Sequence, residues 1–339
     1  MSELRALTGA RGLAAWAVVL YHIRGSIAGL PPRAEAVLAK GYLAVDFFFL
    51  LSGFVIWLTW GPRLYAQGMR AVPGFWRKRV ARIWPLHALM LAFAAMLALL
   101  LVASGRHDPA FPFAELPLHV LLIQNWGYTD ALRWNDPAWS ISSEAAAYLL
   151  FPILACTIDW RRLPAAALVA IAAALLIGLH VVMRDQLSLG SDIPRFGLAR
   201  CLAEFGCGTV LAALYLRRPS IVWPAIVGAV ALAALVAGAP ETATVPAAFA
   251  ALLLLLALTA GLRGNPLETR VIHYLGDISY ATYLSHFLLW KAFKLVRDAG
   301  AVPGGMIAAY LLLVLAASIA LYHLWERPAQ RWVNAAPLS

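Results

Sequence analysis

Charged residues are scarce in this chain of 339 residues. Asp, Glu, Lys and Arg together make up 13 % of it, against roughly 25 % in an ordinary globular protein. Hydrophobic residues make up 62 % instead, and the mean hydropathy is +0.76. This composition excludes a soluble domain with a single anchor and predicts a protein that passes through a membrane many times.

Cysteine is nearly absent as well, and its three positions all lie in apolar segments: Cys156, Cys201 and Cys207. Their spacing fits neither a zinc site nor an extracellular disulfide framework, so we expect no metal and no disulfide. A cleavable leader is also not expected, because the first apolar run is already a full-length span. The net charge of +10 is explained by cytoplasmic Lys and Arg and predicts no nucleic-acid partner.

Long apolar runs follow one another along the sequence. A membrane-spanning helix needs about 20 apolar residues, and the chain has room for about ten. The predicted spans are 7–24, 41–60, 83–104, 142–159, 163–182, 196–216, 221–238, 243–262, 271–293 and 305–325. The run at 117–126 is too short to cross and is expected to be re-entrant or interfacial. We therefore predict an all-α fold in one integral-membrane domain over 1–339.

The distribution of basic residues predicts the orientation. Lys and Arg are more frequent in the segments on the side of the N-terminus, above all in 63–82, and the loop 238–245 on the other side has none. The positive-inside rule then places both termini in the cytoplasm. We expect a multi-pass protein of the inner (cytoplasmic) membrane.

Among the ionisable side chains inside predicted spans, four lie on four separate spans at a similar depth: His22, Asp46, Glu144 and His286. At a rise of about 1.5 Å per residue, all four fall in the outer half of the membrane. Such residues are costly in a bilayer and by default indicate function. Each has an ordinary structural explanation when taken alone, but their common depth favours a shared site.

A second group of charges lies at the cytoplasmic end of the spans. Arg11 stands near the inner boundary of the first span, and the stretch FWRKRVARIWPL brings Arg77, Lys78, Arg79 and Arg82 into the third. Residues three apart on a helix share a face, as Arg79 and Arg82 do here. Arginine binds phosphate in a bidentate manner, so this group predicts an anion site, although basic residues here are also the ordinary positive-inside signal.

Seven segments occur in an order typical of one known family: LTGARGLAAWAVVLYH, GYLAVDFFFLLSGF, FWRKRVARIWP, LLIQNW, WSISSE, LGDISYATYLSH and ERP. On these motifs the chain resembles membrane-bound acyltransferase family 3, the integral-membrane O-acyltransferases of bacterial envelope glycans and some antibiotics. The resemblance covers nearly the whole chain. Its most specific parts are Arg11 with ten residues before His22, and Arg79 and Arg82 followed by Pro85.

The resemblance implies that His22 is the essential catalytic histidine. It also implies that Arg11, Arg79 and Arg82 serve an acyl-CoA donor, with acetyl-CoA as the default. The chain departs from the family pattern after Glu144, where Ala145 stands in place of a common second acidic residue.

Transfer of an acyl group from a thioester to a hydroxyl needs a base, oxyanion stabilisation and exclusion of water. We predict His22 as general base or acyl carrier, with Asp46 or Glu144 orienting its ring. Direct transfer and an acyl-histidine intermediate both stay open. The expected acceptor is a glycan, a glycolipid or a glycosylated small molecule.

The remaining candidates complete the two ends of the site. Arg77 and Lys78 join the donor site, and the candidate acceptor contacts are Asn125, Trp139, Ser140, Tyr283 and His286. A competing interpretation is a proton-coupled transporter whose buried His, Asp and Glu relay protons. The transporter interpretation is disfavoured because no inverted repeat is visible and a transporter has little use for a phosphate-binding arginine cluster at one end. An inactive relative is disfavoured by the full set of motifs.

Overall fold

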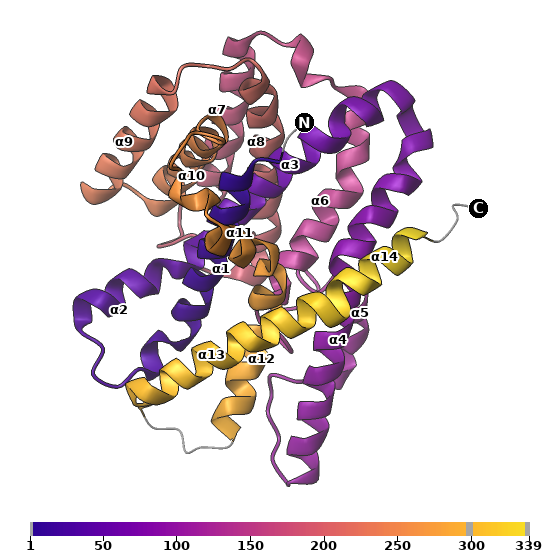
Figure 1. Ribbon diagram of the computed structural model, residues 1–339, viewed down its shortest axis with the longest axis vertical. Helices are drawn as coiled ribbons and strands as arrows, with labels where there is room; N and C mark the ends of the chain where they lie inside the picture. The colour runs from indigo at the N-terminus through magenta and orange to yellow at the C-terminus, as the bar shows by residue number, and fades with distance from the viewer. Residues whose placement is uncertain (1–2, 296–300, 336–339) are drawn as a thin grey trace.

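The predicted spans correspond to helices. The computed structural model describes residues 3–295 and 301–335 and consists mainly of α-helices joined by short turns (Figure 1). The longer helices are α1 (Arg5–Ile23), α3 (Ala44–Gln67), α4 (Val72–Ala103), α6 (Ala138–Thr157), α7 (Ala165–Val182), α8 (Ile193–Leu216), α9 (Val222–Val236), α10 (Glu241–Leu258), α12 (Ser279–Leu295) and α13 (Gly304–Leu321). The shorter ones are α2 (Pro32–Leu38), α5 (Leu116–Val120), α11 (Arg270–Asp277) and α14 (Arg327–Ala335).

Several of these helices suit a bilayer. Among the described residues, seven continuous helical segments are long and apolar enough to cross, and one of them, Pro32–Ala103, holds both α3 and α4. Large apolar side chains are exposed on α7, α9 and α13, for example Ile177, Val230 and Leu312. Such exposure is expected where lipid is the solvent. The chain thus has the helices of an all-α, multi-pass membrane protein, while the number of about ten crossings stays a prediction.

The span predicted at 271–293 is not one continuous helix. It is divided into α11 and α12, which meet at Ile278. Gly276 at this break lies directly against α1, because a Cβ there would come within 1.9 Å of the Thr8 carbonyl oxygen. Only glycine permits so close an approach of two backbones. The break leaves the carbonyl of Gly276 and the hydroxyl of Ser279 next to Arg11 of α1.

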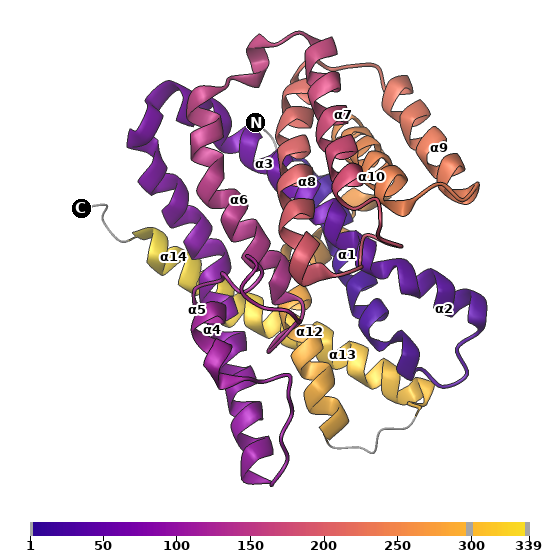
Figure 2. The same ribbon diagram turned by 180° about the vertical axis from the view of Figure 1, so that it is seen from behind.

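Helices α3 and α8 pack closely in the interior, with α6 beside them (Figure 2). A Cβ on Gly53 would lie 1.9 Å from the Phe205 carbonyl oxygen, and one on Gly208 would lie 2.0 Å from that of Leu50. Small residues that let helix backbones touch are typical of membrane interfaces. This close contact fixes α3, and with it the face of α3 that lines the site described below.

The segment predicted as re-entrant contains α5 and then a series of turns rather than a spanning helix. It is held to its neighbours by polar bonds. His87 Nε2 of α4 lies 2.8 Å from the carbonyl oxygen of His119, and Trp126 Nε1 donates to the carbonyl of Ser142 at 2.8 Å. Irregular backbone at membrane depth is tolerated when protein groups satisfy it in this way.

The last helical segment, α13 to α14, passes over α4 and contains a π-helical turn. A π-helical turn, Tyr322–Glu326, joins α13 to α14, and the two run diagonally across the face seen in Figure 1. Such a wider turn rotates the side chains that follow it and frequently occurs at functional sites. Here the turn ends at Glu326, which is 1 % exposed and contacts Arg82 of α4.

Candidate active site

A cavity of about 720 Å³ lies between α1, α3, α4, α6 and α12. Three of the predicted arginines, Arg11, Arg79 and Arg82, line it together, and so do Glu144, Ser140 and Tyr283. The side contributed by α3 is largely apolar and includes Phe48, Leu51, Val55 and Ile56. The cavity therefore joins a cationic end to an apolar channel, which suits an elongated ligand with a charged head.

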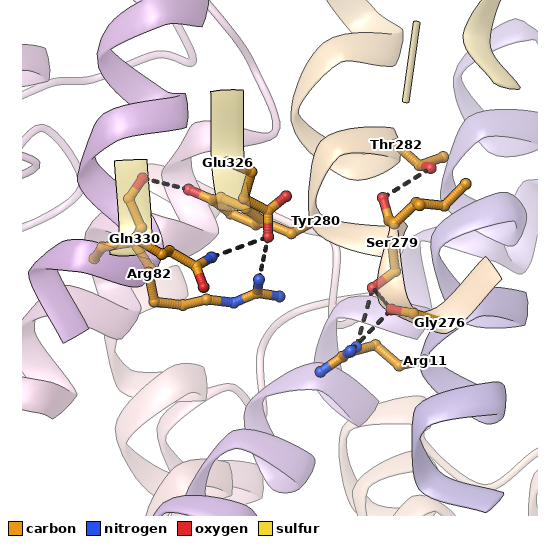
Figure 3. A network of polar contacts seen from close by, with 10 residues as sticks. Arg11, Arg82, Gly276, Ser279, Tyr280, Thr282, Glu326 and Gln330 are labelled. Atoms are coloured by element: carbon orange, nitrogen blue, oxygen red, sulfur yellow. Dashed lines mark hydrogen bonds and ion pairs between the residues drawn. The ribbon is translucent and has the colours of Figure 1, made fainter. Parts of the chain in front are cut away.

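Arg11 is held firmly at the cationic end. Its Nε donates to Ser279 Oγ at 3.0 Å, and its Nη2 donates to the carbonyl of Gly276 at 2.8 Å (Figure 3). These bonds orient the guanidinium plane in advance, so a ligand does not have to order a free side chain.

Arg82 is held by a carboxylate. Its Nη1 forms an ion pair with Glu326, which also accepts from Gln330 Nε2 at 3.2 Å (Figure 3). The guanidinium carbon lies 5.2 Å from the ring centre of Tyr280. The Arg82 side chain is 28 % exposed whereas that of Glu326 is 1 % exposed. Arg82 thus still faces solvent space, and a guanidinium has further N–H donors for a second anion.

Glu144 lies in the wall of the same cavity, on α6. Ser52 Oγ of α3 and Tyr148 OH both donate to its Oε1. Tyr148 in turn lies beside Arg79, whose guanidinium carbon is 5.8 Å from the centre of the tyrosine ring. Two neutral donors therefore stabilise this carboxylate, and a cation stands nearby.

Farther along α6 and α12 from the arginines, Ser140 and Tyr283 form part of the cavity wall. Their hydroxyl oxygens lie 2.8 Å apart, and Tyr283 OH also donates to the carbonyl of Pro137 at 3.1 Å. The ring of Phe48 packs edge-on against Tyr283, with 5.7 Å between the ring centres. On the far side, the Tyr283 ring centre lies 6.2 Å from that of His286.

Two histidines meet beyond this wall. His22 Nδ1 lies 3.1 Å from His286 Nε2 and 3.0 Å from the carbonyl oxygen of Val18, while His286 Nδ1 lies 3.2 Å from that of Thr282. A carbonyl only accepts, so neutral His286 carries its proton on Nδ1 and its Nε2 accepts. His22 Nδ1 faces two acceptors and carries the other proton. These hydrogen bonds assign the free lone pair to His22 Nε2.

The predicted partners of His22 lie elsewhere. Among the described residues, neither Asp46 nor Glu144 bonds to its ring, and the side chain hydrogen-bonded to the ring is His286. Asp46 is instead paired inside the α3–α8 contact: its Oδ1 accepts from Arg200 Nη2 at 2.7 Å and from Nε at 3.1 Å. Asp46 is 0 % exposed and Arg200 1 %. A buried guanidinium requires a carboxylate, and this requirement takes Asp46 away from the histidine.

Some residues predicted to bind the ligand instead contact neighbouring side chains of the protein. Asn125 Nδ2 donates to Ser143 Oγ at 2.9 Å. Trp139 packs edge-on against Phe49, with 5.8 Å between the ring centres. Among the described residues that line the cavity, neither of these predicted contacts occurs, and neither do Arg77, Lys78, His22 or His286.

Other residues of the site were missed by the sequence reasoning. Ser52 and Tyr148 donate hydrogen bonds to Glu144. Glu326 forms an ion pair with Arg82, and Arg200 forms one with Asp46. Two of them had a usable signal. Arg200 is an ionisable residue within a predicted span, which by itself indicates a buried partner, and Glu326 opens the motif ERP. Hydroxyl groups such as those of Ser52 and Tyr148 give no signal of this kind.

Comparisons with known proteins identify related chains. The Acyltransferase domain family matches residues 4–323. The chain is 31% identical to Acyltransferase MdmB of Streptomyces mycarofaciens over 370 residues. The matched region covers 97% of this chain and 92% of the relative. Protein 2 in picA locus of Rhizobium radiobacter is 40% identical over 41% of this chain and 75% of its own length. A candidate O-acetyltransferase of Staphylococcus aureus (strain COL) is 23% identical over 47% of this chain and 26% of its own length. No solved structure matches the chain.

Proposed function

The chain belongs to this acyltransferase family, and from that premise we propose that it transfers an acyl group, acetyl by default, from acyl-CoA to a carbohydrate hydroxyl. That it is an enzyme of acyl transfer follows from the family. The proposal adds the donor, the acceptor class and the residues: a glycan, a glycolipid or a glycosylated small molecule is the acceptor.

One observation carries the donor part of the proposal: three arginines line the cationic end of a single cavity that continues as an apolar channel. Acyl-CoA has the same order of parts, with a phosphorylated nucleotide at one end and a long neutral arm that ends in the thioester. Guanidinium groups bind phosphates strongly, and apolar walls suit the arm. We propose that Arg11, Arg79 and Arg82 bind the phosphates.

The histidine pair supports the chemical step. His22 Nε2, which keeps its lone pair, takes the proton of the acceptor hydroxyl as the oxygen attacks the thioester carbon. The C–O bond forms, the C–S bond breaks, and the proton passes to the departing CoA thiolate. In the alternative route the same nitrogen attacks the thioester and carries the acyl group. Both routes need Nδ1 of His22 to stay protonated, and the acceptor nitrogen of His286 favours that state.

The donor has to pass the wall made by Ser140 and Tyr283 to reach His22. We therefore expect the Tyr283 side chain to move when the donor binds, as gating side chains do in many enzymes. We further propose that the chain is one domain with both termini in the cytoplasm of an inner membrane. The acyl group is then drawn from the cytoplasmic side and delivered near the outer face.

Acetyl-CoA binding by the detergent-purified protein tests the proposal, with wild type beside Arg82→Ala and His22→Ala at two salt concentrations. Arg82→Ala should weaken binding, most clearly at low salt. His22→Ala should bind normally but lose CoA release in the presence of envelope glycans, by about 10²–10⁴-fold. If wild type does not bind acetyl-CoA, the assignment of acyl-CoA as the donor fails. Full turnover by His22→Ala would remove the histidine from the mechanism.

A further inference from the structure

Glu144 stands at an unexpected place for a carboxylate. Ser140, Glu144 and Tyr148 follow one another at intervals of four residues on α6, so each lies about 6 Å from the next along the helix. All three line the cavity. Glu144 therefore lies between the arginine end and the wall at Ser140 and Tyr283, in the middle of the channel rather than at either end.

The two oxygens of this carboxylate differ. Oε1 accepts from both Ser52 and Tyr148. Oε2 accepts no hydrogen bond from the described residues, and it is not fully buried. An ionised carboxylate has roughly four acceptor positions. The protein thus fills one side of Glu144 and leaves the other open to the channel.

An open carboxylate in an apolar channel selects for the part of a ligand that passes it. Around Ser52, which holds Glu144, the α3 wall of the cavity presents Phe48, Val55 and Ile56, whose side chains offer no acceptor. A phosphate placed here would be repelled, whereas a neutral group with an N–H donor would be bound by a charge-assisted hydrogen bond. The arm of acyl-CoA contains two secondary amides, and an amide N–H left unpaired in such a channel costs free energy.

We infer that Glu144 Oε2 accepts an amide N–H of the pantetheine arm, and that Glu144 is a donor-binding residue rather than the carboxylate that orients His22. This inference rests on the proposed function, because it requires acyl-CoA in the cavity. It also gives the donor a direction. Phosphates stay at the arginines, the amide region passes Glu144, and the thioester faces Tyr283.

The test measures KM and kcat for acetyl-CoA in Glu144→Ala, with Glu144→Gln as a second variant that keeps an acceptor oxygen. Thr59→Val is the matched control, since Thr59 also lines the cavity but its hydroxyl already donates to the Val55 carbonyl at 2.8 Å. We expect KM to rise about tenfold or more in Glu144→Ala and less in Glu144→Gln. The kcat values and their pH profile should stay close to wild type, and Thr59→Val should match wild type throughout.

A second probe is a CoA analogue methylated on its arm amides. It should bind wild type about tenfold more weakly than CoA, whereas Glu144→Ala should bind the analogue and CoA equally well. A loss of kcat with unchanged KM in Glu144→Ala would overturn the inference, as would wild-type affinity for CoA in that variant. Failure of the proposed function looks different, because then wild type itself does not bind CoA and Arg82→Ala changes nothing.

Discussion

Asp46 and Glu144 are both carboxylates in predicted spans at similar depth, yet the structure puts them to opposite uses. Asp46 is fully buried between α3 and α8 and is bound to Arg200. Glu144 is bound by two hydroxyl groups and keeps one oxygen open to the cavity. The difference lies in the partner. Arg200 neutralises Asp46 inside a closed contact between helices, with both of its bonds on Oδ1, whereas two hydroxyl groups stabilise Glu144 and leave its other oxygen open to the cavity.

The surroundings of Asp46 extend this contrast. Glu204 lies in the same interior, is 0 % exposed, and interacts electrostatically with Arg200. One guanidinium thus stands among two carboxyl groups. Ionic interactions of this kind hold helices in register but do not reach a ligand. The α3–α8 interior is structural, and the cavity wall on the other side of α3 is where chemistry is available.

The largest effect is expected for Asp46→Asn. The substitution removes the carboxylate to which the buried Arg200 donates, and breaking a buried ion pair in this way typically costs about 3–5 kcal/mol of unfolding free energy. Thermal unfolding in detergent should show the loss, whereas Glu144→Gln should unfold near the wild-type temperature. A double change, Asp46→Leu with Arg200→Met, should recover stability and retain activity. If Asp46→Asn is stable but inactive, Asp46 belongs to the catalytic machinery and the contrast is wrong.

A smaller loss is expected for Gly53→Ala in the same interior. The added Cβ would meet the Phe205 carbonyl oxygen at 1.9 Å, so the helices have to separate. Overpacking of this kind costs about 1–3 kcal/mol, and this case belongs near the upper end. Gly206→Ala is the matched control, because its Cβ would meet only a Leu175 methyl at 3.4 Å. Equal unfolding temperatures for the two variants would contradict the close packing of α3 and α8.

A third carboxylate, Asp136, lies just before α6. Among the described residues it forms no ion pair with an arginine, and it does not line the cavity. Burial raises its pKa to about 6 against the attraction of Lys291. A raised pKa means that the folded state holds the proton more tightly. The resulting stability is complete below about pH 4 and is lost as the pH rises through 6.

Between these values the wild type should lose on the order of 2 kcal/mol relative to Asp136→Asn. Unfolding temperatures of the two proteins from pH 4 to 7.5 measure this loss. A difference between them that does not change with pH would show that folding does not raise the pKa of Asp136.

Much of the architecture was accessible from sequence. Each predicted span overlaps a helix, because a stretch of about 20 apolar residues has few other stable states in a bilayer. Arg79 and Arg82 share the cavity as their spacing predicts, since helical periodicity is local. The break at Ile278 was not predicted, because it depends on Gly276 meeting Thr8 of another helix.

The pairing of polar groups was less accessible. Depth along a helix follows from counting residues, and this counting grouped His22, Asp46, Glu144 and His286 at one level. In the structure all four are buried or partly buried. Rotation and neighbours do not follow from counting. His286, predicted as an acceptor contact, is hydrogen-bonded to His22, and the carboxylates predicted for that place are not.

The sequence by itself determined a helical membrane protein with a row of arginines at one end and polar residues at the other, because hydrophobicity, length and periodicity act within single helices. Only the tertiary structure decided which side chains meet. Arg200 of α8 takes Asp46, the π-turn before α14 turns Glu326 onto Arg82, and the approach of α12 to α1 brings His286 to His22. Hydrogen bonds and ion pairs act over about 3 Å, so helix packing assigns each polar group its role.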